Sequence, residues 1–199
     1  RNTALHFDRL NNGGSCYLAI HGGIEIEKWL DSYSTHLRAG AGGYAGRKLE
    51  KLDRLFLGES SLYFSAWLEE EKEKTILPWR AASNKIYDLP HEIFITTGYE
   101  WDQLDDDSKQ ELLTRNFIIH PSSDRMGYQL KGEPLQLLSL IELISSGVNF
   151  GTIQLLPNGQ LVILMADHQT TGGYPRIAHV IAAHFPKLAQ LRPSDAIKF

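Results

Sequence analysis

The sequence predicts a mainly β fold, a barrel or a sandwich with few helices. Apolar residues occur in short stretches separated by clusters of glycine, proline, asparagine or aspartate, and helical periodicity is scarce. The 17 glycines and 8 prolines often fall between these stretches, which is typical of short strands joined by turns. We expect strands at residues 4–7, 17–20, 55–57, 92–96, 117–119, 152–156, 161–166 and 196–199.

Two of these stretches predict a hairpin. Residues 161–166 form a nearly continuous apolar run, which is typical of a strand buried on both faces. Pro157, Asn158 and Gly159 separate this run from the one at 152–156. An Asn-Gly pair tolerates the positive φ values of a tight turn, so the two runs should pair as neighbouring strands.

Two helices are expected within this β background. Three aspartates at 105–107 precede a short amphipathic segment, and acidic residues favour the N-terminus of a helix. A second helix is expected to begin at Pro175, because proline suits the first helical position. Its apolar face would consist of Ile177, Val180, Ile181 and Leu188. Residues 135–144 fit a buried helix or a strand equally well.

The composition limits the domain organisation and the function. A chain of 199 residues with 42% hydrophobic and 22% charged residues can bury one good core or two small ones. We expect a boundary near residues 89–90, which divides the chain into domains 1–89 and 90–199. The net charge of −4 argues against nucleic-acid binding. No apolar run reaches the length of a membrane span and no signal peptide is visible, so we expect a cytoplasmic protein. The single Cys16 is expected to be a buried thiol in a strand.

The polar segment 167–175 follows the buried strand directly and is the first candidate site. Its two glycines, Gly172 and Gly173, let a ligand approach the backbone closely. A helix beginning at Pro175 would direct unpaired N–H groups and a positive dipole end toward a carboxylate or a phosphate. Asp167 and Gln169 offer acceptor and amide groups to a small amide or lactam. The alternative is a structural turn that the Asp167 side chain caps.

Two arginines are further candidates. Arg125 lies among serines, an aspartate and a glycine, a setting that suits a carboxylate grip, although a surface turn at Asp124 and Arg125 is the alternative. The glycine-rich residues 40–47 lack the third glycine of the dinucleotide fingerprint and the Lys-Ser/Thr of a P-loop. We expect a tightly turned or flexible loop there. Arg47 beside it would clamp a carboxylate or form a surface ion pair.

The eight histidines do not predict a metal site. No His-Glu-x-x-His motif occurs, and His179 and His184 are five residues apart, a spacing that does not bring them to one helix face. A Gly-x-Ser-x-Gly nucleophile elbow is also absent from the sequence.

Several motifs resemble those of one family, the allophanate hydrolase subunit 2 family. This is the family of the 5-oxoprolinase C subunit and of the biotin-dependent urea carboxyltransferase domain. The similar segments lie at residues 19–24, 34–47, 123–128, 151–154, 166–175 and 188–193, so the resemblance extends over nearly the whole chain. It implies a cyclophilin-like β-barrel fold. It also implies that the chain lacks the family's N-terminal portion, where a Gln-Asp-x-Gly-Arg motif is expected.

The resemblance implies an enzyme subunit that acts on a small amide. In the 5-oxoprolinase system this component works with a B subunit to activate 5-oxoproline with ATP, and an A subunit completes ring opening to glutamate. In the alternative reaction, the related domain moves a carboxyl group from biotin to urea. Some relatives are described as antagonists of a sporulation-kinase inhibitor, which leaves a regulatory role as a further alternative. ATP would be bound through the complex, and biotin would be needed only for carboxyl transfer.

The same resemblance implies the site residues. Arg125, Asp167 and Gln169 are expected to be catalytic, with Arg125 holding the substrate carboxylate. The expected substrate-binding residues are Ser34, Arg47, Gln154, Thr170, Thr171, Gly172, Gly173 and Tyr174. No metal ligand is expected.

The chain also departs from the family pattern in three motifs. Tyr33 and His168 each replace an arginine, and Gly98-Tyr99-Glu100 replaces Gly-Pro-Gln. The loss of two arginines near an expected anion site implies a different substrate preference or a weaker activity.

Overall fold

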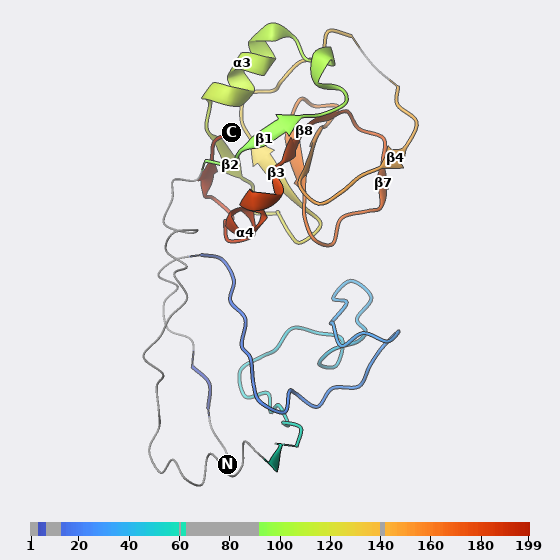
Figure 1. Ribbon diagram of the computed structural model, residues 1–199, viewed down its shortest axis with the longest axis vertical. Helices are drawn as coiled ribbons and strands as arrows, with labels where there is room; N and C mark the ends of the chain where they lie inside the picture. The colour runs from blue at the N-terminus through green and yellow to red at the C-terminus, as the bar shows by residue number, and fades with distance from the viewer. Residues whose placement is uncertain (1–3, 7–12, 60, 63–91, 140–141) are drawn as a thin grey trace. The chain divides into compact units, whose positions relative to one another are not determined.

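The computed structural model describes residues 4–6, 13–59, 61–62, 92–139 and 142–199 (Figure 1). It divides into two compact units. The larger unit comprises Arg1–Cys16 and Ala81–Phe199, and the smaller one Tyr17–Arg80. The expected domain boundary at 89–90 lies outside the described residues, and the division into 1–89 and 90–199 stays a prediction.

A seven-stranded sheet with antiparallel neighbours forms the larger unit, in the order β1-β8-β5-β6-β3-β2-β9. Strands β4 (Ser146–Gly147) and β7 (Thr171–Gly172) form a separate pair. The strands of the large sheet are β1 (Ile95–Thr97), β2 (Phe117–Ile119), β3 (Gly127–Lys131), β5 (Thr152–Leu155), β6 (Leu161–Leu164), β8 (Arg176–Val180) and β9 (Ala196–Ile197).

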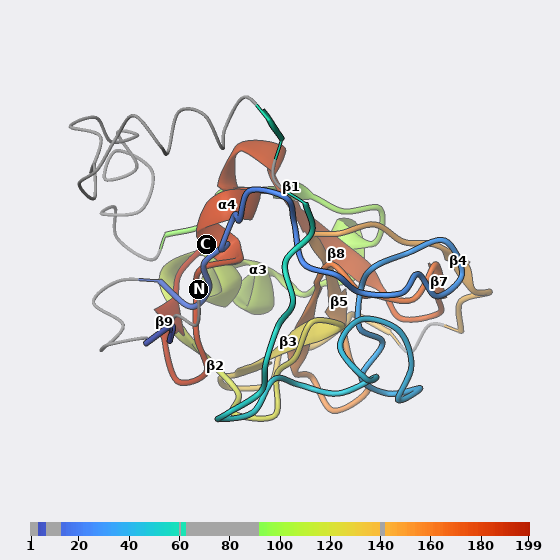
Figure 2. The same ribbon diagram turned by 90° about the horizontal axis from the view of Figure 1, so that it is seen from below.

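The large sheet curls so that its two edges meet. Glu92, just before β1, forms a parallel bridge with Lys198, just after β9. The Ile93 N–H donates to the Lys198 carbonyl at 2.8 Å. Figure 2 shows the sheet wrapping around the interior of the unit. Curling removes exposed strand edges, as in barrels. The predicted mainly β, barrel-like architecture with few helices is confirmed.

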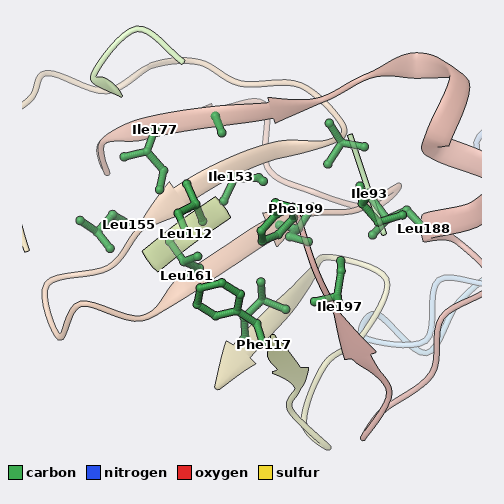
Figure 3. Packing of buried hydrophobic residues seen from close by; sticks show 14 of the residues in the cluster. Ile93, Leu112, Phe117, Ile153, Leu155, Leu161, Ile177, Leu188, Ile197 and Phe199 are labelled. Carbon is green, nitrogen blue, oxygen red and sulfur yellow. The ribbon is translucent and has the colours of Figure 1, made fainter. Parts of the chain in front are cut away.

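The core fills the inside of this curled sheet. Side chains from separate strands, including Phe117, Ile153, Leu161 and Ile177, belong to one buried cluster (Figure 3). Leu112 from helix α3 (Asp106–Thr114) joins the same cluster. Strand β6 is buried on both faces along most of its length, as the apolar run predicts.

The predicted hairpin and the first predicted helix are both present. Strands β5 and β6 are antiparallel neighbours, and the Leu156 N–H donates to the Gln160 carbonyl at 2.8 Å across the turn. Gly159 has a φ of +77°, which the turn requires. Helix α3 begins after Asp105, whose side chain accepts the Ser108 N–H at 2.6 Å as an N-cap.

The helix expected at Pro175 is wrong, because strand β8 occupies this position. Proline lacks an N–H, and Pro175 stands just before the strand, where its carbonyl accepts from Leu155. The register shift opposite Ile153 leaves Ile177 as an extra residue in β8. This bulge breaks the alternation of a strand and imitates helical spacing. Helical structure starts later, in the 3₁₀ helix η2 (Ala182–His184) and helix α4 (Phe185–Leu188).

Several predictions for the first part of the chain also fail. Residues 4–6 and 17–20 form no strand, and Leu57 makes only an isolated bridge with Ile24. Cys16 is exposed, not buried. None of the described apolar side chains in the smaller unit is fully buried, so strands there lack a core to pack on. The described part of 135–144 is irregular, neither helix nor strand.

Within the described ranges, every helix is too short or too polar to cross a lipid bilayer.

Candidate functional site

Arg125 and Asp167 meet at one end of the β3–β6 pair. Arg125 precedes β3 and Asp167 follows β6, and antiparallel pairing brings these ends together. The Asp167 N–H donates to the Arg125 carbonyl at 2.7 Å. Nε and Nη2 of Arg125 donate to the two Asp167 carboxylate oxygens at 2.7 and 2.9 Å. Two expected catalytic residues 42 positions apart therefore form one bidentate pair.

This pair lies at the surface. The Arg125 and Asp167 side chains are 75% and 52% exposed, so the pair contributes little to folding stability. Asp124 accepts the Met126 N–H at 2.8 Å. This hydrogen bond forms the surface turn that the sequence also allows at Asp124 and Arg125. Asp167 orients the guanidinium, and a ligand carboxylate would have to share Arg125 with it.

Gln154 lies in β5 with no exposed surface. Its Nε2 donates to the Tyr174 carbonyl at 3.3 Å. A carbonyl only accepts, so this contact fixes which end of the amide is the nitrogen. The other end, Oε1, is buried and has no hydrogen-bond partner within the described part of the chain. An unpaired buried acceptor costs about 1–3 kcal/mol, which makes Oε1 a ready acceptor for a ligand donor.

The segment after Asp167 covers Gln154. Residues 171 and 172 form β7, and a Cβ on Gly172 would lie 2.7 Å from Gln154 Nε2. Glycine at 172 therefore allows a close approach to a side chain, as well as any approach to a ligand. Of the other expected site residues in this segment, Gln169, Thr170 and Tyr174 are exposed and Gly173 is half-buried. No helix begins at Pro175, so the expected positive dipole end is absent here.

Arg47 and Ser34 belong to the smaller unit. Arg47 clamps a carboxylate, but the carboxylate is that of Asp53, at 2.7 Å through two bonds. These hydrogen bonds, with one from the Glu50 N–H, lower the pKa of Asp53 from 3.8 to about 2. The loop at 40–47 is tightly turned, with positive φ at several residues. The Ser34 N–H donates to Ser32 Oγ at 3.1 Å. Whether these two residues join the site of the larger unit stays a prediction.

Another arginine–carboxylate pair, in the larger unit, is not predicted from the sequence. Glu100 is only 5% exposed. It accepts from Arg176 Nε at 3.1 Å, from Arg176 Nη2 at 2.8 Å and from the Arg176 backbone N–H at 2.8 Å. The sequence did not predict this pair because the helix expected at Pro175 would place Arg176 in its first turn. A strand at 176–180 would have aligned Arg176 with the polar residues of β5.

The electrostatics of this pair favour two charged partners. Burial alone would raise the pKa of Glu100, but the hydrogen bonds and the positive charge of Arg176 outweigh it and hold the pKa below 4.5. The Glu100 hydrogen bond raises the pKa of Arg176. Among the described residues, no three His, Cys, Asp or Glu side chains gather closely enough to hold a metal ion.

This chain matches one family of protein domains. The family model of the carboxyltransferase domain, subdomain A and B, matches residues 1–199. The chain is 37% identical to the C subunit of 5-oxoprolinase from Haemophilus influenzae over 196 residues and to that from Escherichia coli over 195 residues. These matches cover 98% of this chain and 58% of the length of each relative.

A solved structure shows the same fold. The crystal structure of the K. lactis urea amidolyase matches with a TM-score of 0.71 and 25% identity, over 91% of this chain and 12% of that one. The family expected from the motifs is thereby established: the chain belongs to the family of the carboxyltransferase domain, subdomains A and B.

Proposed function

We propose that this protein is one component of an ATP-dependent complex that opens 5-oxoproline to glutamate. The observation that carries the proposal is the 37% identity to the C subunit of 5-oxoprolinase over 98% of the chain. The partners would be two proteins similar to the B and A subunits of that enzyme, and ATP would be bound through the complex. The small cyclic amide would be the substrate that this protein helps to activate.

The larger unit supplies groups suited to this chemistry. Arg125 would hold the substrate carboxylate, with Asp167 orienting its guanidinium. Gln154 would meet the amide, and the glycines at 172 and 173 would let the backbone approach the reacting group. Activation of an amide places negative charge on its oxygen, and prearranged donors stabilise such charge.

The test is reconstitution of the full-length protein with its B-type and A-type partners. 5-Oxoproline-dependent ATP hydrolysis is the expected result. Arg125→Ala should lower turnover, while Arg192→Ala, which removes another exposed arginine paired with an aspartate, should not. Unchanged turnover in Arg125→Ala would remove that residue from the mechanism. Absence of 5-oxoproline-dependent hydrolysis in the wild-type complex would overturn the proposed function.

Carboxyl transfer from biotin to urea or a similar amide is the second candidate. Similarity to the K. lactis urea amidolyase, at a TM-score of 0.71, supports it. This function requires a biotin carboxylase and a biotin carrier. Urea-dependent ATP hydrolysis in the presence of those components, without any response to 5-oxoproline, would favour carboxyl transfer over ring opening.

A further inference from the structure

One face of the β5–β8 pair carries a row of polar side chains. In the register of these strands Thr152 lies opposite His179, and Gln154 lies opposite Arg176. Directly opposed residues of antiparallel strands project to the same face. Thr152 Oγ1 lies 3.2 Å from His179 Nδ1, in agreement with this register. Ile153, between Thr152 and Gln154, points into the core, so the polar row faces away from it.

Arg176 presents a defined set of donors on this face. Glu100 occupies its Nε and Nη2 edge with two hydrogen bonds. A guanidinium has five N–H donors, so those of Nη1 and the second one of Nη2 remain. Within the described ranges, none of these three has a hydrogen-bond partner, and the side chain is 22% exposed.

The Glu100 contacts also make Arg176 a rigid donor. Glu100 holds both the guanidinium and the Arg176 backbone N–H, and the Tyr99 ring lies 5.5 Å from the Arg176 Cζ. Gly98 packs so closely on this strand that a Cβ there would lie 2.0 Å from the Arg176 carbonyl. An arginine held in this way loses little conformational freedom when it binds a ligand. Glu100 is thus a positioning residue for Arg176.

Gln154, across the strand pair, offers the complementary group. Its Nε2 is committed to the Tyr174 carbonyl, which leaves Oε1 as an unpaired acceptor within the described ranges. The Cβ atoms of directly opposed residues are about 4.5–5.5 Å apart. The two residues therefore place a donor and an acceptor side by side on one face, as an amide whose C=O and N–H point to the same side requires. A lactam ring forces that arrangement, and urea also contains it.

We propose that Arg176 and Gln154 together bind the amide edge of the substrate. Arg176 donates to the amide oxygen and Gln154 Oε1 accepts the amide N–H. The inference rests on the proposed function, in which the substrate is a small amide with such an edge. When the amide is activated, negative charge develops on its oxygen, and the fixed guanidinium stabilises that charge.

Access to Gln154 depends on β7, which covers this side chain. A Cβ on Gly172 would lie 2.7 Å from the amide nitrogen of Gln154. Strand β7 is paired with β4 over only two residue pairs, Ser146 with Gly172 and Gly147 with Thr171. A shift of this short strand opens the face on which the amide edge binds.

Comparing two ligands distinguishes loss of the contact to the amide N–H from a general loss of binding. Binding of 5-oxoproline and of its cyclopentanone analogue, in which a CH₂ group replaces the ring N–H, is measured by calorimetry on the full-length complex. The wild type should prefer 5-oxoproline by about tenfold or more, the effect of leaving a buried acceptor unpaired. Gln154→Met should bring this preference close to one. If Gln154 has a purely structural role, Gln154→Met should weaken the binding of both ligands equally and leave the preference intact. This result would overturn the inference.

A second variant tests Arg176 through turnover. Arg176→Lys keeps a positive charge beside Glu100 but cannot reach Glu100 and the amide oxygen in the same geometry. Its kcat should fall by about 100-fold, with a smaller change in KM. The matched control is Arg115→Lys at the C-cap of α3, which alters another arginine–glutamate pair and should keep kcat. An unchanged kcat in Arg176→Lys would contradict the inference.

The outcomes separate the inference from the proposed function. A wild-type complex that neither binds nor cleaves 5-oxoproline overturns both. A wild-type complex that cleaves 5-oxoproline, with its ligand preference preserved in Gln154→Met or with full turnover in Arg176→Lys, overturns the amide-edge site alone.

Discussion

Replacing Gly172 by alanine tests whether this glycine is needed because Gln154 lies against it. The new Cβ would lie 2.7 Å from Gln154 Nε2, whereas ordinary contacts begin at 3.4 Å. Either the side-chain nitrogen or strand β7 would therefore have to move by 3.4 − 2.7 = 0.7 Å. The hydrogen bond to the Tyr174 carbonyl, two residues after Gly172, is already 3.3 Å long, so either movement should break it. Leaving the buried amide without partners should cost about 1–3 kcal/mol of unfolding free energy.

Gly147→Ala is the matched control. Gly147 lies opposite Thr171 in the β4–β7 pair, and a Cβ there would meet no atom within 4 Å. Its φ is not positive, so alanine should be neutral or stabilise by about 0.4–1 kcal/mol. Urea unfolding of the full-length protein, followed by tryptophan fluorescence, compares the two variants through their midpoints.

A double mutant identifies the cause. In a Gln154→Ala background the Cβ at 172 has no amide to displace, so Gly172→Ala should then have little effect. Equal midpoints for Gly172→Ala and Gly147→Ala would refute the steric argument. Additive effects in the double mutant would show that the loss arises elsewhere.

Three further predictions concern the core, the pH response and the exposed arginine. Ile163→Ala should lower the unfolding free energy by about 2–5 kcal/mol, because Ile163 is fully buried, whereas Ile118→Ala, at a position 38% exposed, should cost less than about 1 kcal/mol in the same urea titration. Burial, and then the charge of Arg176, lower the pKa of His179 below 6.5, so the unfolded state binds this proton more tightly. The stability from a neutral His179 is complete above its unfolded pKa and is lost as the pH falls below it; His179→Gln should therefore flatten the decline of the urea midpoint between about pH 7 and about pH 5, and an unchanged decline would contradict this assignment. Arg125→Gln should change the unfolding free energy by less than about 1 kcal/mol because its ion pair is exposed, so a large drop in the urea midpoint would show a structural role instead.

The parts of the fold that the sequence predicts correctly depend on local signals. Asp105 caps helix α3 through the N–H of a residue three positions later, which the acidic cluster anticipates. Asn158 and Gly159 close the β5–β6 hairpin, and the apolar run after them becomes a buried strand. In the smaller unit, strand-like stretches such as 17–20 have no buried apolar partner, and composition alone does not reveal this.

For the candidate site, the sequence predicts some of the residues but not their contacts. Arg125 and Asp167 stand out in sequence because each follows or precedes a strand within a polar segment, and adjacent strand ends bring them together. Asp167 follows a strand that the sequence predicts, but β3, which Arg125 precedes, is not among the expected strands, so their proximity was not predictable. Their bidentate contact was not predictable either, because it depends on the exact turn that Asp124 stabilises.

Glu100 and Arg176 show why the rest could not be predicted. They are 76 residues apart, and their contact depends on how the turn after β1 packs on the start of β8. A bulge at Ile177 gives β8 two consecutive buried residues, which imitates a helix in a pattern of apolar spacing. When that segment is a strand, Arg176 lies opposite Gln154. The pairing with Arg176 then gives a physical reason for glutamate, instead of the family's glutamine, at position 100. A carboxylate there holds the guanidinium through its Nε and Nη2 edge, and a neutral amide could accept at only one of its two ends.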